Sequence, residues 1–190
     1  MSFYEDKANV DKYIELCKDY DGSNIYERLK QHLKEGKSVL ELGTGPGFDI
    51  PFLNEHYHVT GSDFSDEFLV RCKEKYPDIN FIKIDARNID TSTEYDCIYS
   101  NKVLHHLTRG ELSSSLLAQA GILSPGGMIA HSFWLGEEDQ NMEGLLFSYY
   151  RKEELLGILS KNFDVVATLS YREFEEGDSL FVVAKVKAVG

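Results

Sequence analysis

The stretch Val39-Leu40-Glu41-Leu42-Gly43-Thr44-Gly45-Pro46-Gly47 decides how this 190-residue chain folds. Apolar residues on both sides of one acid predict a short buried strand, and the three glycines predict a tight turn directly after it. Glycine accepts a positive φ, and because it has no Cβ, a ligand can lie against bare backbone N–H groups. The stretch therefore predicts a strand that ends in a ligand-binding loop.

The spacing of the glycines argues against two common nucleotide-binding loops. A dinucleotide fingerprint needs G-x-G-x-x-G, whereas Gly43, Gly45 and Gly47 form G-x-G-x-G and Phe48 takes the sixth place. A phosphate loop needs a lysine after its last glycine, and none follows here. The pattern is similar to the first motif of the class I S-adenosylmethionine-dependent methyltransferases. For the loop taken alone, a generic turn between a strand and a helix is the alternative.

The composition predicts one domain, over residues 1–190, in a reducing compartment. A chain of this length can bury one full core. The three cysteines, Cys17, Cys72 and Cys97, are odd in number and far apart, which is typical of the cytoplasm. No apolar run reaches the ~18 residues of a membrane span. A net charge of −12 repels phosphate backbones. We expect a cytoplasmic monomer or homodimer that binds neither nucleic acid nor membranes.

Predicted strands and helices alternate along the chain. Two helices joined by a turn are expected before the first strand, and we expect the region 1–35 to form a helical lid. The predicted strands are 38–42, 58–62, 80–84, 95–100, 128–134, 163–169 and 180–185. The predicted helices between them are about 48–55, 66–76, 112–123 and 152–161. This order predicts an α/β fold: a doubly wound, seven-stranded, mostly parallel sheet whose antiparallel last strand forms an edge hairpin with the strand before it.

Polar residues follow the predicted strands at the edge of the sheet where ligands bind in this fold class. Asp63 follows the second strand, where a carboxylate can accept from two ribose hydroxyls, and Phe64 beside it can lie on an adenine ring. After the third strand, Asp85 can accept from an adenine amino group, and the backbone at Ala86 can reach a ring nitrogen. Each acid has an alternative role in a turn or a helix cap, and Phe64 has one in the core.

Two adjacent histidines, His105 and His106, follow the fourth strand, after Ser100 and Asn101. Neighbouring side chains on a helix point to different faces, so the pair is a poor metal site, and we expect no metal. A capping or packing role is an alternative for both histidines.

Five motifs in order resemble the small-molecule branch of the class I methyltransferases, over roughly residues 20–186. They lie at 41–47, 59–64, 85–86, 95–107 and 123–127. The resemblance implies S-adenosylmethionine as the cofactor and a Rossmann-like fold. The cofactor-binding residues that it implies are Glu41, Gly43, Thr44, Gly45, Gly47, Asp63, Phe64, Asp85, Ala86, Ser100 and Asn101.

The resemblance also implies a function, the methylation of a small-molecule acceptor. Because the sulfonium already activates the methyl group, the protein mainly positions the acceptor and excludes water. His106 matches a histidine frequent in this family, and it and His105 are the candidate bases. We expect the N-terminal helices and the segment 133–150 to form the acceptor pocket. A non-catalytic sensor or scaffold that binds S-adenosylmethionine is the alternative.

Overall fold

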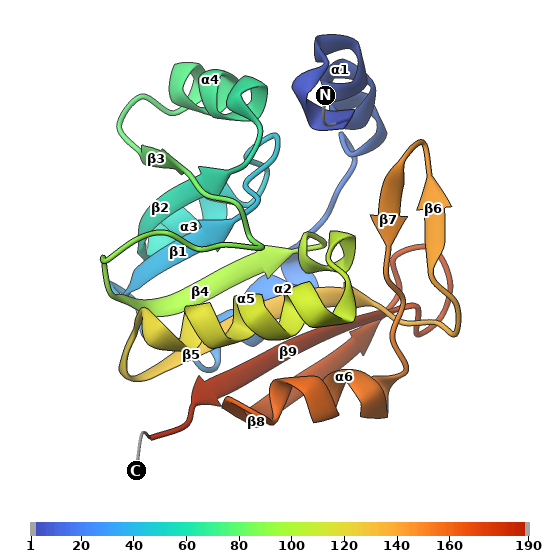
Figure 1. Cartoon of the computed structure of the whole chain (residues 1–190). Coiled ribbons are helices and arrows are strands. Elements are labelled where there is room, and N and C mark those ends of the chain that lie inside the picture. The colour runs from blue at the N-terminus through green and yellow to red at the C-terminus, as the bar shows by residue number, and fades with distance from the viewer. Residues whose placement is uncertain (1–2, 189–190) are drawn as a thin grey trace.

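The computed structural model describes residues 3–188, so residues 1, 2, 189 and 190 of the predicted domain lie outside the described part. A seven-stranded sheet in the order β3-β2-β1-β4-β5-β9-β8 forms its centre (Figure 1). The strands are β1 (Ser38–Leu42), β2 (His58–Asp63), β3 (Asn80–Lys83), β4 (Tyr95–Asn101), β5 (Leu123–Trp134), β8 (Phe163–Tyr171) and β9 (Ser179–Val186). Only β9 runs antiparallel to its neighbours β5 and β8. The predicted fold class and the edge hairpin are confirmed.

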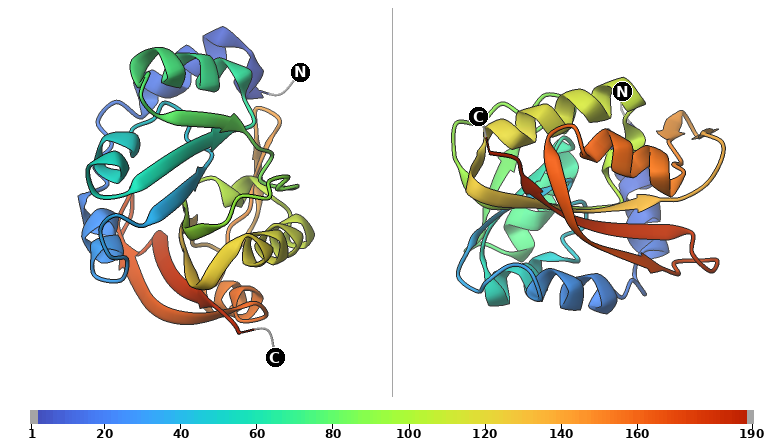
Figure 2. Two further views of the ribbon diagram at one scale, coloured as in Figure 1. Left: turned by 90° about the vertical axis from the view of Figure 1, so that its left-hand side faces the viewer. Right: turned by 90° about the horizontal axis from the view of Figure 1, so that it is seen from below.

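Helices cover both faces of the sheet, as the right-hand view of Figure 2 shows. They are α2 (Ser23–Lys30), α3 (Ile50–His56) and α4 (Asp66–Lys75) on one face, and α5 (Arg109–Gly121) and α6 (Lys152–Leu159) on the other. Because successive side chains of a strand point to opposite faces of the sheet, each strand contributes apolar residues to both hydrophobic cores. On β1, for example, Leu40 and Leu42 pack toward α5 and α6, and Val39 packs toward α2 and α3. Each core is continuous beneath its helices, so the sheet is a rigid base for the residues at its edge.

One small element was not predicted, a hairpin of β6 (Gln140–Met142) and β7 (Leu145–Phe147). Sequence analysis assigned this segment to the acceptor pocket without a strand. Glu143 and Gly144, which join the two strands, both have positive φ, of 52° and 82°. This is the conformation of a two-residue type I′ turn. The usual Asn-Gly or Asp-Gly signal is missing, which is why the sequence did not reveal the hairpin.

Helix α5 begins at Arg109, three residues before the predicted start at Leu112. Thr108 and Glu111 form a reciprocal capping box, in which Thr108 Oγ1 accepts from the N–H of Glu111 and Glu111 Oε2 accepts from the N–H of Thr108. This cap fixes the first turn, which carries little apolar periodicity of its own.

The N-terminal region divides into two parts with different positions. Helix α2 buries Ile25 and Leu29 in the helical layer on the sheet. The short η1 (Phe3–Glu5) and α1 (Lys7–Leu16) lie instead above the carboxyl ends of the strands, between α4 and the β6–β7 hairpin (Figure 1). Within the region 1–35, which was predicted as a lid, η1 and α1 thus lie over the strand ends, whereas α2 packs on the face of the sheet. No helix within residues 3–188 is long and apolar enough to cross a membrane.

Candidate functional site

The glycine loop lies where the strand order reverses, between β1 and β4. Gly43, Gly45 and Gly47 all have positive φ, of 67°, 52° and 72°, as the sequence predicts. A Cβ on Gly43 would stand 2.5 Å from the methyl carbons of Val103, which follows β4. The missing side chain therefore lets the two turns at the switch point touch.

Asp63, at the end of β2, fixes this loop. Its Oδ2 accepts from the N–H of Gly45 at 2.8 Å, and its Oδ1 accepts from the N–H of Ser65 at 2.8 Å. Burial raises the pKa of the carboxyl to about 6, against the opposing effect of these backbone N–H groups. One carboxylate thus connects the glycine loop to the N-terminus of α4.

Phe64 and Asp85, the predicted adenine contacts, are connected through Arg87. Phe64 is 39% exposed, and the Arg87 guanidinium lies 5.6 Å from its ring centroid. Arg87 also pairs with Asp85 at 2.6 Å, which lowers the pKa of that carboxyl. Ala86 packs against the sheet core between them. The Asp85 carboxylate is therefore ionised but already engaged by a neighbouring guanidinium.

A cavity of about 980 Å³ extends from the glycine loop toward the N-terminal segment, the β6–β7 hairpin and the loop at 172–178. The predicted site residues in its wall are Gly43, Thr44, Gly45, Asn101, His105 and His106. Those outside its wall are Glu41, Gly47, Asp63, Phe64, Asp85, Ala86 and Ser100. The cavity thus contains the predicted methionine and acceptor regions, and the predicted ribose and adenine residues lie beside it.

The Ser100 side chain does not reach the cavity, because neighbouring residues on β4 point to opposite faces. Its hydroxyl bonds Nδ1 of His131 at 2.9 Å, and Nε2 of His131 bonds Oε1 of Gln119 at 2.7 Å. All three side chains are buried under α5. Glu41 is also buried, and burial followed by the nearby charge of Asp49 holds its pKa well above the usual range. Ser100 and Asn101 are thus the last two residues of β4, and of the two only the Asn101 side chain lines the cavity.

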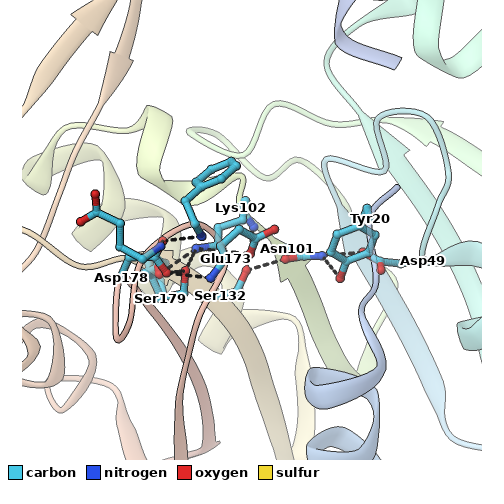
Figure 3. Close-up of polar contacts among 11 residues, drawn as sticks. Tyr20, Asp49, Asn101, Lys102, Ser132, Glu173, Asp178 and Ser179 are labelled. Atoms are coloured by element: carbon cyan, nitrogen blue, oxygen red, sulfur yellow. Dashed lines mark hydrogen bonds and ion pairs between the residues drawn. The ribbon is translucent and has the colours of Figure 1, made fainter. Parts of the chain in front are cut away.

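Asn101 joins the two ends of a polar network (Figure 3). Its Nδ2 donates to the hydroxyl of Tyr20 at 2.6 Å and to Asp49 Oδ2 at 3.1 Å, and its Oδ1 accepts from Ser132 at 2.6 Å. Tyr26 donates to the other oxygen of Asp49. Asp49 is a site residue that was not predicted from the sequence. It stands at the N-cap of α3 directly after the glycine loop, but its carboxylate turns into the cavity wall instead of capping the helix.

The two histidines lie on η2 (Leu104–His106), a 3-10 turn, and both face the cavity with ring centroids 4.0 Å apart. The expectation that they point to different faces is wrong, since the two rings meet in the wall of the same cavity. Nδ1 of His106 lies 2.7 Å from the carbonyl oxygen of Leu146 and must donate to it, so the lone pair is on Nε2. That atom lies 3.5 Å from the Tyr4 hydroxyl. Burial lowers the pKa of His106, which favours the neutral ring.

His105 has a different environment. It is 3% exposed and stacks on Phe147 at 5.2 Å, and neither ring nitrogen has a hydrogen-bond partner within the described residues. Burial, followed by His106 and Lys102, lowers its pKa well below the usual range. A buried polar ring without partners in a cavity wall is a candidate for contact with a ligand.

Residues 39–127 match the model of a family described as a methyltransferase domain. In structure, the chain is similar to a 1,6-didemethyltoxoflavin-N1-methyltransferase of Burkholderia thailandensis, with a TM-score of 0.81 and 19% identity over 95% of this chain and 85% of that one. That protein was solved with 1,6-didemethyltoxoflavin and S-adenosylhomocysteine. The fold is that of the class I methyltransferases. The match of residues 39–127 to a methyltransferase domain confirms the resemblance of the motifs.

Two curated relatives are also methyltransferases. A dTDP-3-amino-3,4,6-trideoxy-alpha-D-glucopyranose N,N-dimethyltransferase of Streptomyces venezuelae is 24% identical over 64% of this chain and 54% of its own length. A phosphatidylethanolamine N-methyltransferase of Cereibacter sphaeroides is 37% identical over 31% of this chain and 32% of its own length. The chain thus spans about half of the first relative and about a third of the second.

Proposed function

We propose that the protein is an S-adenosylmethionine-dependent methyltransferase that acts on a small-molecule acceptor. The observation that carries this proposal is the hydrogen bond from Gly45 to Asp63, which fixes a loop of positive-φ glycines in the wall of a cavity. The match of residues 39–127 to a methyltransferase domain supports it. The sensor or scaffold alternative has no observation of its own in its favour.

The cofactor roles follow from the positions of the residues. Gly43, Thr44 and Gly45 line the part of the cavity proposed for the methionine moiety, and Asp63 is the proposed partner of the ribose. Asp49 is a buried carboxylate in the same wall, and we assign it to the cationic part of the methionine moiety. Phe64, Asp85 and Ala86 are the proposed adenine contacts, and Asn101 closes the far side.

The acceptor end offers positioning and one oriented proton acceptor. Bound S-adenosylmethionine would supply a methyl group already activated by its sulfonium. Because the Leu146 carbonyl fixes the tautomer of His106, its Nε2 presents a lone pair toward the cavity and the Tyr4 hydroxyl. We assign His106 the role of taking a proton from the acceptor, and His105 the role of hydrogen bonding to it. The aromatic walls around them exclude water.

We also propose that the protein is cytoplasmic, acts as a monomer or homodimer and does not bind nucleic acid. Its three cysteines are unpaired, which fits a reducing compartment. Its net charge of −12 disfavours contact with phosphate backbones.

Calorimetric titration tests the cofactor first. S-adenosylmethionine and S-adenosylhomocysteine should bind the wild type, and NAD should not. Binding of NAD alone, or of none of the three, would contradict the proposal.

A screen of small acceptors for release of S-adenosylhomocysteine then tests turnover. His106→Gln should lower kcat and leave cofactor affinity unchanged, whereas His106→Gln with full activity would remove this residue from the proposed chemistry.

A further inference from the structure

We infer that the acceptor carries an anionic oxygen group, a carboxylate or another acidic oxygen, which the Lys102 ammonium binds in the cavity. This inference rests on the proposed function, because it names the class of acceptor for the same site. Lys102 directly follows β4 and lines the cavity. Sequence analysis did not assign it a role.

The backbone of Lys102 has a conformation that is unusual for a residue other than glycine. Its φ is 55°, and its N–H donates to Ser132 Oγ at 2.8 Å, which connects it to the network of Asn101 (Figure 3). Left-handed conformations of non-glycine residues are concentrated at functional sites. This conformation directs the side chain inward, where only 11% of it is exposed.

Two hydrogen bonds and one contact with an aromatic ring hold the Lys102 ammonium in place. Nζ donates to the carbonyl oxygen of Phe133 at 3.2 Å and to Ser179 Oγ at 2.6 Å. Ser179 accepts this bond because its own hydroxyl donates to Asp178. Nζ also lies 3.3 Å from the ring centroid of Trp134. The aromatic face that could hold a cationic acceptor is therefore occupied by an ammonium of the protein itself.

No carboxylate of the described residues forms a hydrogen bond with this ammonium. The nearest is Glu173, at 4.0 Å, on the loop between β8 and β9 (Figure 3). The other charged residue in the wall that is not exposed, Asp49, is bound to Tyr26 and Asn101. Glu173 and Asp178 both place negative charge near Nζ, yet burial still lowers the pKa of Lys102 to about 7, so these two charges compensate the buried ammonium only in part. An anion from the acceptor would supply a counterion that hydrogen bonds directly to Nζ.

The surrounding side chains suit such an anion. His105 lies beside Lys102 along Trp134, and its ring N–H has no acceptor in the described residues. A neutral imidazole can donate this N–H to the oxygen that Lys102 binds. The remaining carboxylates of the wall, Asp19, Asp21 and Glu143, are exposed at the rim, where solvent screens them.

Matched pairs of small ligands test the inference without a known acceptor. Protein saturated with S-adenosylhomocysteine is titrated with benzoate, 4-hydroxyphenylacetate and cyclohexanecarboxylate, and separately with the primary amide of each, by ligand-observed NMR. At least one carboxylate should bind about tenfold more tightly than its amide, the size of one charge-assisted hydrogen bond. Lys102→Met should abolish this preference, and Glu173→Gln should increase it because the internal competitor is gone.

Lys12→Met is the matched control, since Lys12 also lines the cavity but is exposed at its rim. It should keep the preference for carboxylates. The inference is overturned if no carboxylate binds more tightly than its amide, or if Glu173→Gln, in which Lys102 is intact, weakens carboxylate binding. If S-adenosylhomocysteine itself does not bind, the proposed function fails. If it binds and the preference is absent, only the anionic acceptor fails.

Discussion

The two ends of the site are built in different ways. At the cofactor end, positive-φ glycines and two backbone N–H groups on Asp63 fix the geometry, and all of these residues lie within a short part of the chain between β1 and α4. At the acceptor end, the contacts join segments that are far apart in the sequence, such as Tyr4 with His106 and Lys102 with Glu173.

This difference separates what is common to a fold from what is particular to one protein. Backbone geometry around a loop changes little when side chains change, so the cofactor end is a property of the fold. The acceptor end depends on side chains from η1, the β6–β7 hairpin and the loop at 172–178, which a few substitutions can alter. The two ends should therefore respond to substitution as differently as they are built.

The largest effect is expected for Asp63→Ala. The change removes the acceptor of the Gly45 and Ser65 N–H groups together with the proposed ribose partner. Affinity for S-adenosylhomocysteine should fall on the order of a hundredfold in calorimetry, since buried donors are left unpaired. Asp66→Ala, nearby at an exposed ion pair with Lys83, should change it little. Equal losses in the two variants would show that Asp63 does not organise the cofactor end.

A somewhat smaller effect is expected for Gly43→Ala. The new Cβ would stand 2.5 Å from the methyl carbons of Val103, at a φ of 67°. Overpacking and the left-handed conformation together should lower the free energy of unfolding by about 2–3 kcal/mol in a denaturant titration. Gly126→Ala isolates the conformational part, because φ is 78° there and no atom lies within 4 Å of the added Cβ. Val103→Ala in the Gly43→Ala background should recover part of the loss. If both glycine variants lose the same stability, the contact with Val103 has no energetic role.

The sequence predicts the glycine loop and the position of Asp63 at the cofactor end, since these residues are close in the chain and the loop conformation follows from residue type. Every strand of the sheet and the positive φ of Gly43, Gly45 and Gly47 were foreseen. Asp49, whose carboxylate turns from the start of α3 into the cavity wall, was missed. The contacts of the acceptor end were not foreseen, because they depend on tertiary packing. Lys102 carries no local signal for its role, and the β6–β7 hairpin lacks the common turn residues. The cavity residues Tyr4, Tyr13 and Tyr20 lie in the region 1–35, which was predicted only as a helical lid.

The acceptor end can be followed spectroscopically, because Trp134 is the only tryptophan in the chain and Lys102 lies against it. The pKa of Lys102 is about 7, lowered by burial against the opposing charges of Glu173 and Asp178; His105 and Tyr171 also face this group. Trp134 emission should therefore change with a midpoint near pH 7, as the ammonium loses its charge, and Lys102→Met should remove the transition.

The same titration has a consequence for stability. The pKa of Lys102 is lower in the folded state than in the unfolded chain, so between about pH 7 and 9 the unfolded state binds more protons. The free energy of unfolding of the wild type should then rise with pH relative to Lys102→Met, by at most about 1.4 kcal/mol per pH unit. A flat difference across this range, together with an unchanged Trp134 emission, would show that Lys102 keeps its charge there.

The smallest effect on stability is expected at the rim, for Lys12→Ala. Lys12 on α1 and Glu143 on the β6–β7 hairpin form an ion pair at 3.0 Å across the cavity, and both side chains are more than half exposed. Such a pair contributes less than about 1 kcal/mol, so the free energy of unfolding should barely change. Because the pair nevertheless connects α1 with the β6–β7 hairpin over the cavity, Lys12→Ala should raise the KM for the acceptor at low salt. Its affinity for the cofactor should equal that of the wild type. A loss of cofactor affinity equal to the rise in KM would mean that the acceptor end and the cofactor end are not independent.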